Sequence, residues 1–163
     1  MNPHNGRFQL AHFMKITDRY GNKRWFLNGL LHRDDGPAVI CFNGYQEWYL
    51  NGQLHRDNGP AVIHPDGSQL WYLNGLRHRI DGPAVIWPTG TQEWYSNGSL
   101  HRVDGPAVIK FNGLHEWRLN GLRHRIDGPA VIWPGGKPEW WVNGYTVAPF
   151  FGNYQGDHNN APL

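Results

Sequence analysis

Short alternating stretches of apolar and polar residues, separated by turn signals, run through most of this chain. Residues 46–50 (QEWYL) are rich in aromatic residues, and the pair Asn51-Gly52 follows them directly. Such a stretch predicts a β-strand, and Asn-Gly accepts the positive φ angles of a two-residue hairpin turn. The returning strand, residues 53–55, ends before Gly59-Pro60, because proline has no N–H to donate to a ladder. The pattern predicts a β-hairpin.

A further strand is predicted at residues 61–63 (AVI), and a turn around Gly67 leads from it into the next hairpin. No stretch of this unit carries apolar residues at helical spacing. We therefore expect an all-β protein.

The hairpin pattern returns with a constant period of 23 residues. Residues 73–88 are repeated letter for letter at residues 119–134, and every unit carries a tryptophan three residues before Asn-Gly: Trp25, Trp48, Trp71, Trp94, Trp117 and Trp140. A fixed period of this length indicates a repeat architecture, in which each unit buries its apolar surface against its neighbours.

The expected fold is an elongated, single-layer antiparallel sheet of six stacked 23-residue hairpin units with a cap at each end. Two strands per unit advance the sheet by about 10 Å, so the six tryptophans should span roughly 50 Å. Strand alternation places Trp48 and Leu50 on one face and Tyr49 on the other. We expect the tryptophan row to form the core, which leaves the tyrosine and valine positions partly exposed.

Three segments are predicted along the chain. Residues 1–20 form an N-terminal cap strand, in which Phe8, Leu10 and Ile16 belong to a period-two alternation. Residues 21–147 form the repeat array. Residues 148–163 form a C-terminal cap and a loose polar tail.

Composition and charge narrow the class of protein. The net charge is +2, and acidic residues lie close to the basic ones, which argues against a dedicated nucleic-acid binder. A lone cysteine, Cys41, excludes an internal disulfide framework and suits a reducing compartment. No apolar run has the length of a transmembrane span, and no secretory leader is visible. We expect a cytoplasmic protein.

The motif W-x-x-N-G, followed by H-R and a glycine turn at a 23-residue period, resembles the MORN repeat, a β-hairpin unit named for membrane occupation and recognition. The likeness covers residues 21–147. The variant H-R-x-D-G-P-A is similar to repeats of antitoxin-like bacterial proteins and of phage and large-virus proteins. The resemblance implies an elongated interaction scaffold without catalytic residues.

Variation between the units suggests where a protein partner binds. Trp87 and Trp133 occupy a position that holds His64 and Lys110 in the units between, which gives a 46-residue super-period. We expect these tryptophans to contact a partner, together with the tyrosines of the opposite face, and packing on that face is the alternative. Exposed apolar area of this extent indicates a partner or a second copy of the chain, a homodimer. The tyrosines are Tyr49, Tyr72 and Tyr95.

Every complete unit also carries a His-Arg pair, and its arginine has two interpretations. It can bond the aspartate two residues later and brace the Gly-Pro corner, or it can present a row of forked donors to nucleic acid, anionic lipid head groups or acidic side chains. The arginines are Arg33, Arg56, Arg79, Arg102 and Arg125.

Metal binding and catalysis are not expected. Equivalent histidines lie about 10 Å apart, whereas zinc needs its ligands at ~2.0–2.1 Å, so each histidine is expected to bond a backbone group instead. No nucleophile, base and oxyanion donor converge in one place. An enzyme would need a cleft beside a cap that contains Cys41 or His12. We therefore predict a non-enzymatic scaffold without cofactor.

Overall fold

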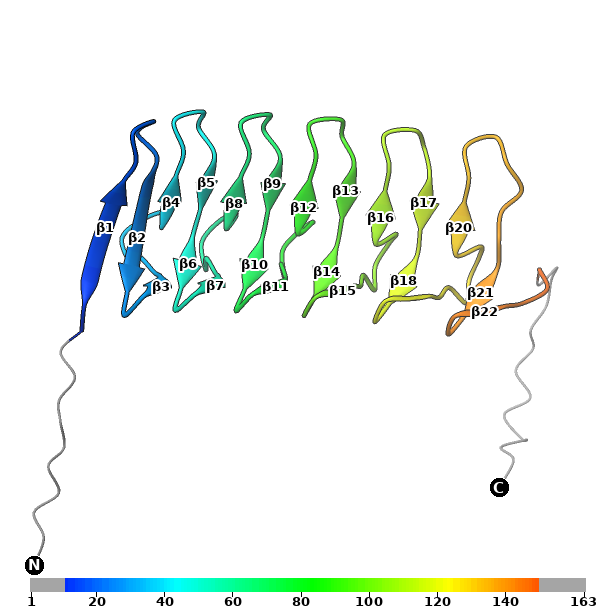
Figure 1. Ribbon diagram of the computed structural model, residues 1–163. Helices are drawn as coiled ribbons and strands as arrows, with labels where there is room; N and C mark the ends of the chain where they lie inside the picture. Colours follow the sequence, from blue (N-terminus) through cyan, green and yellow to red (C-terminus); the bar gives the residue numbers. More distant parts are fainter. Residues whose placement is uncertain (1–10, 150–163) are drawn as a thin grey trace, which may run out of the picture.

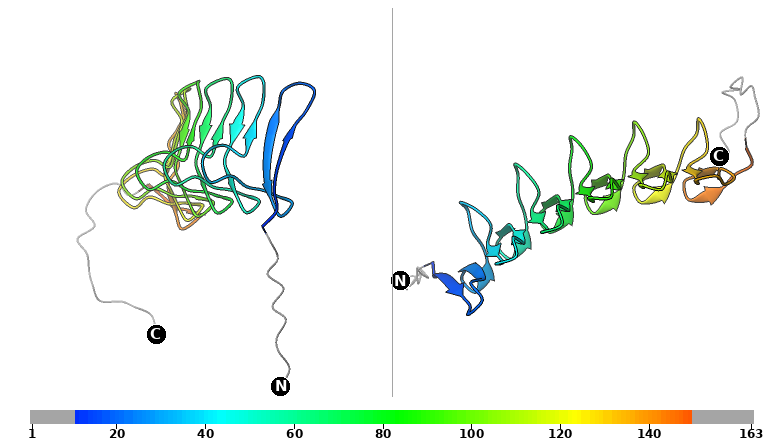
Figure 2. Two further views of the ribbon diagram at one scale, coloured as in Figure 1. Left: turned by 90° about the vertical axis from the view of Figure 1, so that its left-hand side faces the viewer. Right: turned by 90° about the horizontal axis from the view of Figure 1, so that it is seen from above.

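The computed structural model describes residues 11–149 and shows an all-β protein drawn out along one axis. A 12-stranded antiparallel sheet runs through the molecule, and five two-stranded hairpins lie along it (Figure 1). Seen from the N-terminal end, successive units lie behind one another (Figure 2). The predicted row of stacked hairpins in one open layer is confirmed.

The long sheet takes two strands from most units, in chain order. Its path is β1 (Phe13–Thr17), β2 (Lys23–Leu27), β4 (Val39–Ile40), β5 (Gln46–Glu47), β8 (Val62–Ile63), β9 (Gln69–Leu70), β12 (Val85–Ile86), β13 (Gln92–Glu93), β16 (Val108–Ile109), β17 (His115–Glu116) and β20 (Val131–Ile132), with β3 (Leu30–Leu31) paired to β2.

The hairpins are each closed by an Asn-Gly turn. They are β6 (Tyr49–Leu50) with β7 (Gln53–Leu54), β10 (Tyr72–Leu73) with β11 (Leu76–Arg77), β14 (Tyr95–Ser96) with β15 (Ser99–Leu100), β18 (Arg118–Leu119) with β19 (Leu122–Arg123), and β21 (Trp141–Val142) with β22 (Tyr145–Thr146). In the first of them Asn51 has φ 49° and Gly52 has φ 79°, as a turn with two positive φ angles requires.

The chain bends at the tryptophan of each unit from the second to the fifth. Trp48 lies between β5 and β6 and belongs to neither strand. Its N–H donates to the Ala61 carbonyl at 2.8 Å, and its carbonyl accepts from the His55 N–H at 3.0 Å. One residue therefore joins the long sheet to the hairpin and ends the simple strand alternation.

The core differs from the one expected. The buried apolar side chains are the alanine and valine of each Gly-Pro-Ala-Val-Ile segment, such as Ala84 and Val85, together with Leu70 and Leu114. The ladder tryptophans are only half-buried. The predicted tryptophan core and exposed valines are wrong, because the bend at tryptophan turns the valine face inward, beneath the hairpins.

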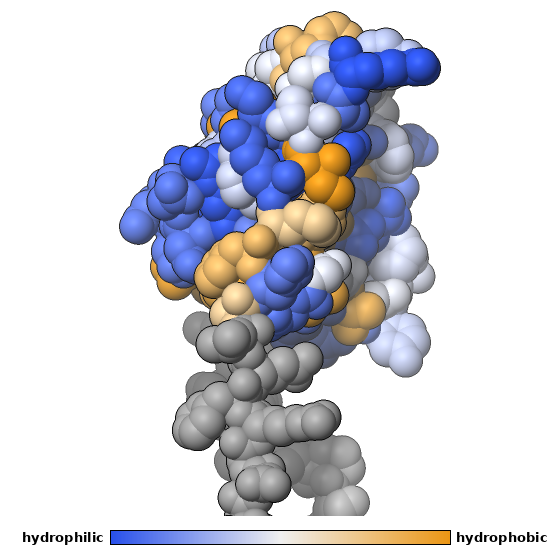
Figure 3. Space-filling view, turned by 60° about the vertical axis from the view of Figure 1, so that its left-hand side comes forward, coloured by the Kyte–Doolittle hydropathy of each residue, from blue (hydrophilic) through white to orange (hydrophobic). Residues whose placement is uncertain are grey.

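Both ends of the array depart from the repeat. The β1 strand pairs with β2 over five residues, and its own residues are all exposed; Figure 3 shows apolar patches at this end of the molecule. At the other end Pro138 interrupts the ladder, so that Val131 and Glu139 form an isolated bridge. The predicted strand residues Phe8 and Leu10, and the tail from residue 150, lie outside the described residues.

Among residues 11–149 no helix is long and apolar enough to cross a membrane.

Candidate binding clefts between the repeats

Five loops that begin with the His-Arg pair project side by side along the array, and we call them the His-Arg loops. Clefts lie between successive loops. Their volumes are about 620 Å³ between the first and second loops, 590 Å³ between the second and third, and 790 Å³ between the third and fourth. The loops are residues 32–37, 55–60, 78–83, 101–106 and 124–129.

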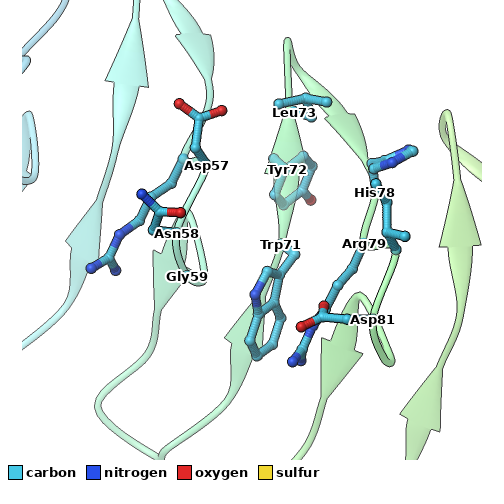
Figure 4. A pocket seen from close by; sticks show the side chains of 11 residues that line it. Asp57, Asn58, Gly59, Trp71, Tyr72, Leu73, His78, Arg79 and Asp81 are labelled. Atoms are coloured by element: carbon cyan, nitrogen blue, oxygen red, sulfur yellow. The ribbon is translucent and has the colours of Figure 1, made fainter.

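Each His-Arg loop is held by its arginine, as the third loop illustrates. The Arg79 guanidinium lies 4.1 Å from the centre of the Trp71 ring, donates from Nε to Asp81 at 2.8 Å, and donates to the Pro83 carbonyl at 3.3 Å. Figure 4 shows Arg79 running alongside Trp71, with Asp81 at its end. A Cβ on Gly82 would lie 3.1 Å from the guanidinium carbon, so a larger residue here would require the Arg79 side chain to move by a few tenths of an ångström.

The arrangement repeats in the other loops. The four arginine–aspartate hydrogen bonds measure 2.7 to 2.9 Å, and they hold the pKa of each aspartate below its usual range. The arginine side chains are 22–23% exposed, whereas their aspartate partners are 77–83% exposed. The outer rim of the clefts therefore presents carboxylates. This favours the interpretation in which arginine braces the Gly-Pro corner over a free arginine row.

The histidines tie each loop to the next unit. Nδ1 of His78 accepts a hydrogen bond from the Asn97 backbone N–H at 3.1 Å, and the other ladder histidines repeat it at 3.0 to 3.2 Å. The predicted bond from each histidine to a backbone group is confirmed. A neutral ring that accepts at Nδ1 carries its proton on Nε2, and in the first two loops Nε2 lies 3.1 and 3.2 Å from Oδ1 of Asp34 and Asp57.

Removing one of these histidine hydrogen bonds should lower the stability of the protein measurably. We expect His78→Ala to lower the free energy of unfolding by about 1 kcal/mol, because the Asn97 N–H loses its acceptor at the junction of two units. Urea unfolding followed by tryptophan fluorescence measures it. The control His12→Ala removes an exposed histidine outside the ladder and should change stability by less than about 0.5 kcal/mol. Equal effects of the two substitutions would contradict this role.

The residues predicted to contact a partner lie in several environments. Trp87, Tyr72 and Tyr95 are half-buried against the cluster of Val62, Leu70 and Val85, so packing accounts for them. Tyr49 is also half-buried.

Trp133 shares the local sequence of Trp87 but lies in a different environment. It is 42% exposed, and its Nε1 donates to Glu139 at 2.9 Å. The interruption of the ladder at Pro138 explains the difference, because the next unit no longer covers this side chain. The assignment of these five aromatic residues as partner contacts stays a prediction.

Three apolar side chains of the His-Arg loops are more exposed than these aromatic residues, and two of them, Ile80 and Val103, line the clefts. Ile80, Val103 and Ile126 follow the arginine in the last three His-Arg loops and are 93%, 83% and 77% exposed. The first two loops hold Asp34 and Asp57 there. A β-branched apolar residue inside a turn, where other copies carry aspartate, was the available signal.

A charged network supports the fifth unit. Glu116 is 8% exposed and accepts hydrogen bonds from Arg118 Nε at 2.9 Å and from Arg123 at 2.8 Å. Arg123 also donates to Glu139 at 3.2 Å. Burial raises the pKa of Glu116, but the hydrogen bonds from Arg118 and Arg123 outweigh it, so the net pKa is lowered.

The residues considered for chemistry do not meet in one place. The cleft beside β1 is lined by Phe13, Trp25 and Arg33 among others, and neither Cys41 nor His12 belongs to its lining. In the part of the chain that the structure describes, no three His, Cys, Asp or Glu side chains are grouped closely enough to hold a metal ion. No family model, curated protein or solved structure was found to match this chain.

Proposed function

We propose that this protein is a non-enzymatic scaffold that binds an extended segment of a protein partner along the His-Arg loops. The observation that carries the proposal is the row of clefts at one-unit spacing, bordered by exposed Ile80 and Val103, with the exposed Ile126 at the same position of the next loop. Isolated exposed apolar residues are common in proteins, but a row on successive clefts is typical of a contact surface. The resemblance to MORN repeats supports the same role.

The spacing suits an extended chain. Successive clefts lie about 10 Å apart, because each unit contributes two strands. Three residues of extended or polyproline II backbone cover ~9–10 Å, so every third residue of a partner would meet a new cleft. A row of evenly spaced clefts therefore fits a linear segment better than a compact surface.

The test replaces the three apolar residues together. The triple variant is Ile80→Thr, Val103→Thr, Ile126→Thr. In affinity capture from the native host we expect it to recover at least about tenfold less partner than the wild type does, a loss of ~1.4 kcal/mol in binding free energy. The variant keeps β-branched side chains of similar size while removing apolar contact area.

The matched control is Phe42→Ser, Phe111→Ser, which removes exposed apolar rings from turns at the opposite end of the strands. This control should bind as the wild type does, and equal losses in both variants would overturn the proposal. Binding that falls steeply between low and moderate salt would instead favour an anionic polymer held by the arginines.

A further inference from the structure

The second His-Arg loop differs from the other four two residues after its arginine. Asn58 stands where the other loops carry an aspartate. Among residues 11–149, no carboxylate lies within 4.0 Å of the Arg56 guanidinium, whereas the other four arginines each bond their own aspartate. Arg56 is thus the one loop arginine without a carboxylate.

Everything else about Arg56 follows the common pattern. Its guanidinium lies 3.9 Å from the centre of the Trp48 ring and donates to the Pro60 carbonyl at 3.1 Å. A Cβ on Gly59 would lie 3.0 Å from the guanidinium carbon. These contacts hold the guanidinium as in the other loops, and among residues 11–149 its Nε–H has no hydrogen-bond acceptor. Burial lowers the pKa of Arg56, which remains charged at neutral pH.

We propose that Arg56 binds a carboxylate of the partner, an acidic side chain of the extended segment, in the place that an internal aspartate occupies in the other loops. The first loop provides the template, because Asp35 bonds Arg33 at 2.7 Å while Asp34 bonds His32 at 3.1 Å. In the second loop Asp57 bonds His55 in the manner of Asp34. A second carboxylate beside Asp57 therefore reproduces a pair that the chain already builds.

A single anchor of this kind would set the alignment of the partner. Ile80, Val103 and Ile126 recur at one-unit spacing, so an extended segment could shift by one unit and keep two of its three apolar contacts. Arg56 lines both the cleft between the first and second loops and the cleft between the second and third. Figure 4 shows Asn58 on the wall that faces Trp71 across the latter. The inference rests on the proposed scaffold role and adds the chemistry that fixes the register.

The site can be tested without the partner. Arginine Nε–H resonances of the full chain are followed by NMR while sodium acetate replaces sodium chloride at constant ionic strength. We expect the Arg56 resonance to shift, and the other four loop arginines to stay nearly unchanged because their aspartates occupy the same donor. An unshifted Arg56, or equal shifts of all five, would overturn the proposal.

Two substitutions exchange the site between loops. Asn58→Asp supplies the missing carboxylate, and we expect it to abolish the Arg56 shift and to leave the chain at least as stable to urea. Asp81→Asn removes a carboxylate and should give Arg79 a new response to acetate. If neither substitution changes the response of its own arginine, the carboxylate site is refuted.

The partner itself separates this inference from the scaffold role. Asn58→Asp should weaken capture of the partner, as the triple apolar variant does. Capture that is lost in the triple variant but unchanged in Asn58→Asp would refute the carboxylate anchor and leave the scaffold standing. Capture unchanged in both would refute the scaffold role, while the acetate response would still decide whether Arg56 binds carboxylates.

Discussion

Replacement of Trp71 by alanine is expected to lower the free energy of unfolding by about 2–3 kcal/mol. The indole lies at the bend between the long sheet and the hairpin, is half-buried, and carries the Arg79 guanidinium on its face. Its loss removes apolar contact area and the cation–π contact, and it leaves Arg79 without the surface that positions it over Gly82. Equilibrium urea unfolding of the two proteins measures the difference.

The control for this prediction is built into the repeat. Trp140 occupies the same position in the last unit, but Ala148 stands where the other units have arginine. Trp140→Ala should lower the free energy of unfolding clearly less, because in the described part of the chain no Lys or Arg side chain lies over this ring. A double-mutant cycle of Trp71→Ala with Arg79→Ala isolates the contact between them, for which we expect about 0.5–1 kcal/mol. Equal costs at Trp71 and Trp140 would show that the arginine contributes nothing.

Replacement of Glu116 by glutamine is expected to lower the free energy of unfolding by about 2–3 kcal/mol. Glu116 balances Arg118 and Arg123, which are each 24% exposed, and the amide keeps the shape of the side chain but removes its charge. Two partly buried guanidinium groups are then left without their carboxylate. Glu139→Gln is the control. Because Glu139 is 38% exposed, its replacement should lower the free energy of unfolding less. A smaller effect at Glu116 than at Glu139 would contradict the prediction.

The same carboxylate gives the stability of the protein a pH dependence. Because the pKa of Glu116 is lower in the folded protein than its ordinary value of 4.5, its contribution is fully present above pH 4.5 and is lost as the pH falls through the folded pKa. The exposed loop aspartates change stability in the same direction. We expect the difference between wild type and Glu116→Gln to narrow as the pH falls below 4.5. A difference that stays constant would exclude Glu116 as its source.

The path of the chain could be predicted because its signals are local. Asn51-Gly52 alone specifies a turn with two positive φ angles, and Pro60 ends the returning strand. The constant period then places every hairpin beside the next, so the direction and pairing of the long sheet follow. These features depend on residues that are close in sequence.

The core and the clefts could not be predicted in the same way. Strand alternation predicts which side chains share a face only if the strand continues through Trp48, whereas the chain bends there and changes which side chains face inward. The sequence allows two roles for Arg79, because its contacts with the Trp71 ring and the Pro83 carbonyl form only when the loop closes. Exposure of Ile80 likewise depends on how the loop projects.

The dependence of each unit on its neighbours alone has a consequence for how such a protein can change. Residues 73–88 and 119–134 are identical and lie 46 residues apart, so recombination between the corresponding gene segments would add or delete two whole units in frame. Every junction in the product would already exist in the parent. The length of the array could thus grow or shrink in steps of ~20 Å, and the number of its clefts by two at a time, while folding remains intact.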